Sequence, residues 1–168
     1  MSTYFWDFII IGAVVLIFLI LARRLPVAAQ FQKAEDEVSP ARIVAVGAMA
    51  QADDAFDRKD YTAAESLYIK IAAQEPNNFK VYDRLGTIYI VQKNYYDAKD
   101  AFLQAIKLES GDLSLFIKLG DAYMGLKDYF KASQSYMQAV EQEPKNKKYR
   151  ELYEKAQKAL DKEKKKKK

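Results

Sequence analysis

Residues 79–112 read FKVYDRLGTIYIVQKNYYDAKDAFLQAIKLESGD, and residues 113–146 read LSLFIKLGDAYMGLKDYFKASQSYMQAVEQEPKN. Placed one above the other, the two stretches show the same residue types in column after column. The spacing is constant and equals the sequence separation of Phe79 and Leu113, which we call the repeat length. Part of the pattern extends back over residues 45–78. A fixed period of this length indicates repeated supersecondary units that bury their apolar faces against one another.

The recurring columns hold small residues, aromatic residues and turn residues. A Lys, an Asp or Asn and a Tyr begin one half of each unit, an Ala and an aromatic ring follow, and a Glu closes it. These columns are Lys59-Asp60-Tyr61, Lys93-Asn94-Tyr95 and Lys127-Asp128-Tyr129; Ala64, Ala98 and Ala132; Tyr68, Phe102 and Tyr136; and Glu75, Glu109 and Glu143.

Each column predicts a structural task on a pair of helices. Asp60, Asn94 and Asp128 precede apolar-periodic runs, where a short side-chain acceptor caps free backbone N–H groups. Gly86 recurs as Gly120, and both predict a close approach of a neighbouring helix. We expect helices near residues 40–58, 61–74, 79–92, 95–108, 113–126, 129–142 and 147–162.

The pattern resembles the tetratricopeptide repeat, whose motif is W-x₂-L-G-x₂-Y…A-x₃-F…P. Tyr82 and Phe116 stand in place of the Trp, and Ser110 replaces the Pro of the middle unit. The resemblance implies an all-α fold, a TPR-type α-solenoid of three helix-turn-helix repeats plus a C-terminal capping helix. Ahead of it the sequence predicts a single N-terminal transmembrane helix.

The predicted organisation has five parts. They are a transmembrane anchor (1–24), a linker (25–39), three repeat units within 40–146 (45–78, 79–112 and 113–146), a capping helix (147–162) and a Lys-rich tail (163–168). The first unit departs furthest from the motif, as terminal repeats often do because one of their faces has no neighbour.

The predicted anchor rests on residues 8–22, which carry no polar side chain. With the four residues before it, the run has the length of about 20 residues that a bilayer requires. Arg23 and Arg24 follow the run, and no Lys or Arg precedes it. The sequence therefore predicts a single-pass protein of a bacterial inner membrane, with its N-terminus outside and its repeats in the cytoplasm. A signal peptide cleaved after Ala29 is the alternative.

Composition argues against catalysis. The chain has no Cys and no His, which removes thiolate chemistry, the commonest general base and the commonest zinc ligand. No phosphate-loop, dinucleotide or calcium-loop motif is present. We therefore expect no enzyme activity, no catalytic residues, no cofactor, no metal and no small-molecule substrate.

The resemblance implies that the first helix of each pair lines a groove for an extended peptide or a helix. By register, the partner-binding groove would hold Val46, Met49, Asp53, Phe56, Lys80, Asp83, Thr87, Ile90, Ser114, Ile117, Asp121 and Met124. Three Asp among apolar residues predict a partner that is basic and apolar, or else are solvated surface residues. The family's carboxylate-gripping groove would need basic residues where Met49 and Asp53 stand.

The expected function is a membrane-anchored adaptor or scaffold that binds a protein partner. The alternatives are an organellar protein-import receptor, whose acidic groove would suit basic targeting peptides, and a self-associating structural scaffold. The Lys-rich tail predicts contact with anionic lipid or RNA, or only a solvated helix end.

Overall fold

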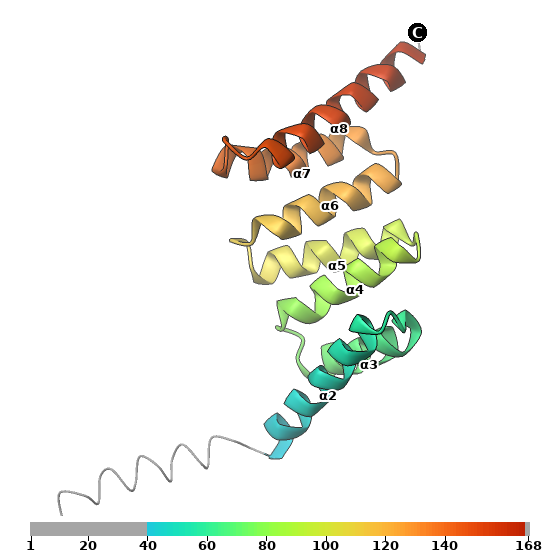
Figure 1. The fold of residues 1–168 in the computed structure, drawn as a ribbon, viewed down its shortest axis with the longest axis vertical. Helices are drawn as coiled ribbons and strands as arrows, with labels where there is room; N and C mark the ends of the chain where they lie inside the picture. The colour runs from blue at the N-terminus through green and yellow to red at the C-terminus, as the bar shows by residue number, and fades with distance from the viewer. Residues whose placement is uncertain (1–39, 167–168) are drawn as a thin grey trace, which may run out of the picture. The chain divides into compact units, whose positions relative to one another are not determined.

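The computed structural model describes the backbone of residues 40–166 and the side chains of residues 47–166 (Figure 1). That part of the chain is entirely α-helical, with seven helices and no strand. They are α2 (Pro40–Asp57), α3 (Tyr61–Gln74), α4 (Phe79–Val91), α5 (Tyr95–Leu108), α6 (Leu113–Gly125), α7 (Tyr129–Gln142) and α8 (Lys147–Lys166). The part of α2 from Gly47 onward and helices α3 to α8 lie in one compact unit.

The helices follow the predicted spacing closely. From α2 to α7, each begins at the expected residue and ends within one residue of the expected end. The exception is α8, which continues to Lys166, whereas the sequence predicted an end at 162 followed by a separate tail. Lysines in a last helical turn interact favourably with the helix dipole, which explains why the helix runs into the Lys-rich segment.

The predicted membrane location is wrong by the test that the structure offers. Among residues 40–166, no helix is both long enough and apolar enough to cross a bilayer. The residues predicted to span the membrane (1–24) and the linker (25–39) lie outside the described residues. The import-receptor alternative depended on the predicted membrane location and is not carried forward.

Within each hairpin the turn is built by a lysine in the left-handed backbone region. Lys59, Lys93 and Lys127 have φ angles of 62°, 61° and 61°. The Lys59 N–H donates to the Phe56 carbonyl at 2.9 Å, and the next N–H donates to the Ala55 carbonyl at 2.9 Å. This pair of bonds is a Schellman cap, which satisfies carbonyls left free at a helix end. Left-handed geometry usually falls to Gly, so these lysines are strained at the same place in every unit.

The residue after each lysine begins the second helix. Asp60 accepts a hydrogen bond from the Ala63 N–H at 3.1 Å, and Asp128 accepts one from the Lys131 N–H at 3.1 Å, as predicted. Asn94 differs, because its side chain donates to Asp97 and caps no backbone N–H group. An amide that has a carboxylate within reach on the first turn gains a stronger, charge-assisted bond there.

Close contacts between a glycine and an aromatic ring hold the hairpins together. A Cβ added at Gly86 would lie 2.6 Å from Cε1 of Phe102, and one added at Gly120 would collide with the Tyr136 ring. Both rings are buried, and so are Ala98 and Ala132 on the same second helices. The close approach of a neighbouring helix that was predicted at Gly86 and Gly120 is confirmed. The last hairpin is covered by α8, whose buried Ala156 shares a core with Ala132 and Tyr136.

Candidate functional site

The first helices of the three hairpins, α2, α4 and α6, carry the predicted groove residues, and we call their shared surface the first-helix face. The side chain of Val46 lies outside the described side chains. Lys80, Ser114 and Asp121 are exposed. The remaining eight are half-buried: Met49, Asp53, Phe56, Asp83, Thr87, Ile90, Ile117 and Met124.

Two of the three aspartates on this face each accept a hydrogen bond from a buried tyrosine. The Tyr68 hydroxyl donates to Asp53 at 2.7 Å, and the Tyr136 hydroxyl donates to Asp121 at 2.6 Å. Burial raises the pKa of both tyrosines well above the ordinary value, and the hydrogen bonds to the carboxylates raise it further. Each tyrosine therefore stays a hydrogen-bond donor, and each aspartate is oriented by the core.

Two cations lie against aspartates of the preceding unit. Arg84 Nε lies 3.2 Å from Asp53, and its guanidinium stacks 4.5 Å from the centre of the Phe56 ring. Lys118 Nζ lies 2.6 and 2.8 Å from the two carboxylate oxygens of Asp83. Asp53 and Asp83 therefore already face cations of this chain. Among the described residues only Asp121, of the three, has no cation in salt-bridge range.

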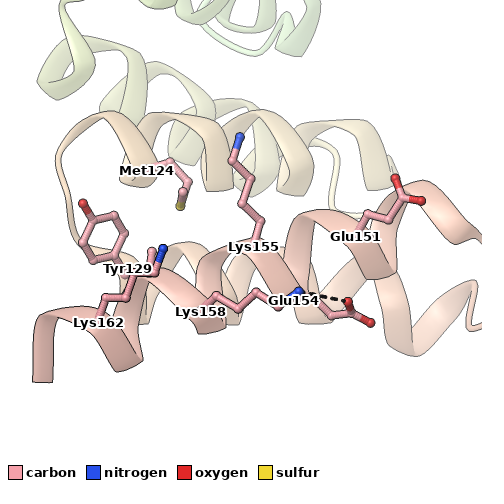
Figure 2. Close-up of a pocket in the computed structure, with 8 residues that line it drawn as sticks. Met124, Tyr129, Glu151, Glu154, Lys155, Lys158 and Lys162 are labelled. Atoms are coloured by element: carbon pink, nitrogen blue, oxygen red, sulfur yellow. Dashed lines mark ion pairs between the residues drawn. The ribbon is translucent and has the colours of Figure 1, made fainter. Parts of the chain in front are cut away.

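The sequence did not reveal the contribution of α8 to this surface. A cleft of 490 Å³ lies between α8, the end of α6 and the start of α7 (Figure 2). In Figure 2, Met124 of α6 and Lys155 of α8 project into it from opposite sides, with Tyr129 at one end. Its lining is Met124, Tyr129, Glu151, Glu154, Lys155, Lys158, Ala159 and Lys162. The spacing alone could have indicated this role, because α8 begins one repeat length after α6.

A second feature that sequence reasoning missed lies on the second helices. Ile69, Leu103 and Met137 are 49%, 43% and 37% exposed, and they stand one repeat length apart on α3, α5 and α7. We call these three residues the second-helix ladder. Tyr96 and Phe130, each two helical turns before its ladder residue, are also exposed. The repeat columns contained this signal, but exposure is a property of the packed structure.

The tetratricopeptide repeat model matches residues 79–112 and 113–146, the two units that the sequence aligned best. Two of the three predicted units therefore match the tetratricopeptide repeat family. No curated protein matches the chain.

Solved structures share the fold. The first TPR of Spaghetti (RPAP3), bound to the HSP90 peptide SRMEEVD, is 22% identical with a TM-score of 0.65, over 69% of this chain and 92% of that one. The second TPR domain of human RPAP3, in complex with the HSP70 peptide SGPTIEEVD, is also 22% identical, with a TM-score of 0.64 over 69% and 97%. The Arabidopsis OM64 TPR domain is 16% identical, with a TM-score of 0.63 over 68% and 95%.

Proposed function

We propose that this protein is an interaction adaptor that binds an extended or helical segment of a partner protein along the first-helix face. The observation that carries the proposal is a row of half-buried apolar side chains on that face. Such side chains are anchored in the core and still have area to lose to a partner, at about 25 cal/mol for each Å² removed from water. They are Met49, Phe56, Ile90, Ile117 and Met124.

The similar structures support a peptide or helix as the ligand class. Two of them hold peptides, the HSP90 segment SRMEEVD and the HSP70 segment SGPTIEEVD. Their identity to this chain is low, so the fold is shared and the particular peptide is not carried over. Met49 and Asp53 also leave α2 without a basic residue at the positions where a carboxylate clamp would need one.

Charges on the first-helix face would fix the position of a bound partner segment more than they would raise its affinity. Because Arg84 and Lys118 lie against Asp53 and Asp83, a basic partner would have to compete with cations already in place. Exposed ion pairs contribute about 0–1 kcal/mol, so apolar anchors must supply most of the affinity. A Lys or Arg of the partner has its best place beside Asp121.

The test is to select binders from a random peptide library on the full-length protein and to measure their affinity for substituted proteins. Ile117→Glu and Ile90→Glu place a charge in the middle of the proposed surface and should weaken binding by tenfold or more, about 1.4 kcal/mol. Leu103→Glu, which makes the same kind of change on the second-helix ladder, is the matched control. Binders that tolerate Ile117→Glu but are lost with Leu103→Glu would overturn the proposal.

The second-helix ladder favours a second candidate function, self-association. Three exposed apolar side chains recur at the same position of successive second helices, and contiguous exposed apolar patches mark interaction sites. Sedimentation of the full-length protein over a range of concentrations tests it. Concentration-dependent assembly that Leu103→Glu abolishes and Ile117→Glu leaves intact would support this role. A monomer at every concentration would exclude it.

A further inference from the structure

We propose that α8 extends the first-helix face and that its cleft against α6 and α7 binds an acidic partner segment with an apolar anchor. This inference rests on the proposed function, because it names the chemistry of one end of the same binding surface. The observation that supports it is a group of lysines that surrounds the apolar part of the cleft lining.

By register, α8 occupies the place of the first helix of a hairpin. It begins at Lys147, one repeat length after Leu113 begins α6, just as α6 begins one repeat length after Phe79 begins α4. The same spacing carries Asp121 onto Lys155 and Met124 onto Lys158. Because α8 also packs on α7 as α6 packs on α5, these lysines continue the row of positions that the first helices present.

The lining of this cleft carries more lysines than glutamates. A smaller cleft of 360 Å³ adjoins the first and shares Tyr129, Ala159 and Lys162 with it. Together they are lined by five lysines and three glutamates: Lys127, Lys155, Lys158, Lys162, Lys166, Glu151, Glu154 and Glu163.

Within residues 47–166, neither Lys155 nor Lys162 has a hydrogen-bond or ion-pair partner, and Lys158 has only a loose pair with Glu154 at 3.9 Å. The contrast with the other end of the face is clear, since Arg84 and Lys118 each lie against an aspartate there. Unpaired cations at one end of a binding face favour carboxylates on the ligand.

The apolar part of the cleft lining limits the kind of anion that the cleft can bind. Met124, Tyr129 and Ala159 make part of the lining apolar, and a Leu, Met or Phe side chain of a peptide would cover that part. The three glutamates of the lining would repel the closely spaced phosphates of RNA or of an anionic bilayer surface more strongly than a few separated carboxylates. A segment with a few separated carboxylates around an apolar residue fits both parts. A protein segment is therefore the occupant we infer.

The probe is a short fluorescein-labelled peptide in which glutamates flank a central Leu-Phe pair, titrated with the full-length protein. Versions with Gln or Lys in place of Glu are its controls. Lys155→Glu with Lys162→Glu should weaken binding of the Glu peptide by about tenfold and leave the Gln peptide nearly unchanged. Binding of the Glu peptide should also fall as salt rises, because exposed charges are screened within about 10 Å at 0.1 M.

Lys70→Glu with Lys107→Glu makes the same change in net charge on exposed positions of α3 and α5, and it should have no such effect. Equal loss in both double variants, or tighter binding of the Lys peptide, would overturn the inference. So would displacement of the peptide by RNA or by phosphatidylserine vesicles at lower concentrations than by unlabelled peptide.

Failure of the acidic end and failure of the adaptor role give different results in these experiments. Library-selected binders that are lost with Ile117→Glu but indifferent to the Lys155 and Lys162 reversals would leave the adaptor role standing and remove only the acidic end. Binders sensitive to neither set of substitutions would remove both.

Discussion

The Tyr136 hydroxyl on α7 donates a hydrogen bond of 2.6 Å to the Asp121 carboxylate on α6, and one repeat in three lacks this pair altogether. The first unit has the same pair, Tyr68 with Asp53. The middle unit replaces both partners together, with Phe102 where the tyrosine stands and Thr87 where the aspartate stands. Hydroxyl and carboxylate are thus present together or absent together.

The paired replacement predicts a measurable coupling in the middle unit. Phe102→Tyr alone brings a buried hydroxyl to a place without its carboxylate, and Thr87→Asp alone adds a carboxylate without its donor. Made together, the two substitutions should recreate the pair, with a favourable coupling energy of about 1–2 kcal/mol after allowance for the exposed side of the aspartate. Urea unfolding of the four proteins gives this coupling directly.

The reverse cycle supplies the control for that experiment. Asp121→Thr with Tyr136→Phe converts the third unit to the pattern of the second, so the double variant should cost less than the two single costs added. Strict additivity in both cycles would mean that the two columns vary independently and that the hydrogen bond contributes little to stability.

Gly86 should resist substitution even by alanine. A Cβ there would lie 2.6 and 2.7 Å from Cε1 and Cδ1 of the buried Phe102 ring, so the ring or the helix has to shift. We expect Gly86→Ala to lower the free energy of unfolding by about 1–3 kcal/mol, despite the better helix propensity of Ala. Gly47→Ala is the matched control, because a Cβ there meets nothing within 4 Å. It should raise stability by roughly 0.5–1 kcal/mol, and a similar loss at both glycines would contradict the close contact.

The left-handed lysines predict a stabilising substitution. Lys93 has a φ of 61° at a Schellman cap, where Gly has no Cβ to strain the backbone. Lys93→Gly should therefore raise the free energy of unfolding by roughly 0.5–1 kcal/mol, as measured by thermal or urea unfolding. Lys107→Gly removes the same side chain from the regular helix α5 and should instead lower stability by about 1 kcal/mol. A loss at Lys93 as large as that at Lys107 would refute the assignment of the cap.

Alkaline pH should destabilise the repeats through their buried tyrosines. Because the pKa values of Tyr68 and Tyr136 are raised in the folded state, the folded protein keeps these protons while the unfolded chain loses them near pH 10. The stabilisation is complete below pH 10 and is lost as the pH rises further, by at most about 1.4 kcal/mol per pH unit for each tyrosine.

Urea midpoints measured between pH 9 and pH 11 test the alkaline effect. Tyr136→Phe should flatten the fall, whereas Tyr96→Phe, which alters an exposed ring, should not. An unchanged slope in Tyr136→Phe would show that the hydroxyl ionises as readily in the folded protein as in the unfolded chain.

The hairpins could be predicted because their determinants repeat along the chain. Gly86 and Phe102 lie in columns that recur at one fixed spacing, and a small residue facing a ring is a local requirement that every unit shares. The helix bounds followed from the same columns, since the residue that caps one helix also marks the end of the turn before it.

The electrostatics of the site could not be predicted in the same way. Lys118 reaches back to Asp83 in the preceding unit, and Arg84 reaches back to Asp53 while stacking on an aromatic ring. These contacts depend on the reach and rotamer of long side chains rather than on repeat columns. The sequence therefore showed an acidic face, whereas the structure shows compensated acids at one end and unpaired lysines at the other.

The position of α8 bears on how such an array can grow or stop. Lys147 starts a helix in the same frame as Leu113. The backbone geometry would therefore admit one more hairpin between α7 and α8. What α8 lacks is an apolar far side, because its exposed residues are almost all lysines and glutamates. The polarity of these exposed side chains, and not the backbone of α8, would therefore disfavour packing of another hairpin on that side. An in-frame duplication of residues 113–146 would lengthen the protein without redesigning either end.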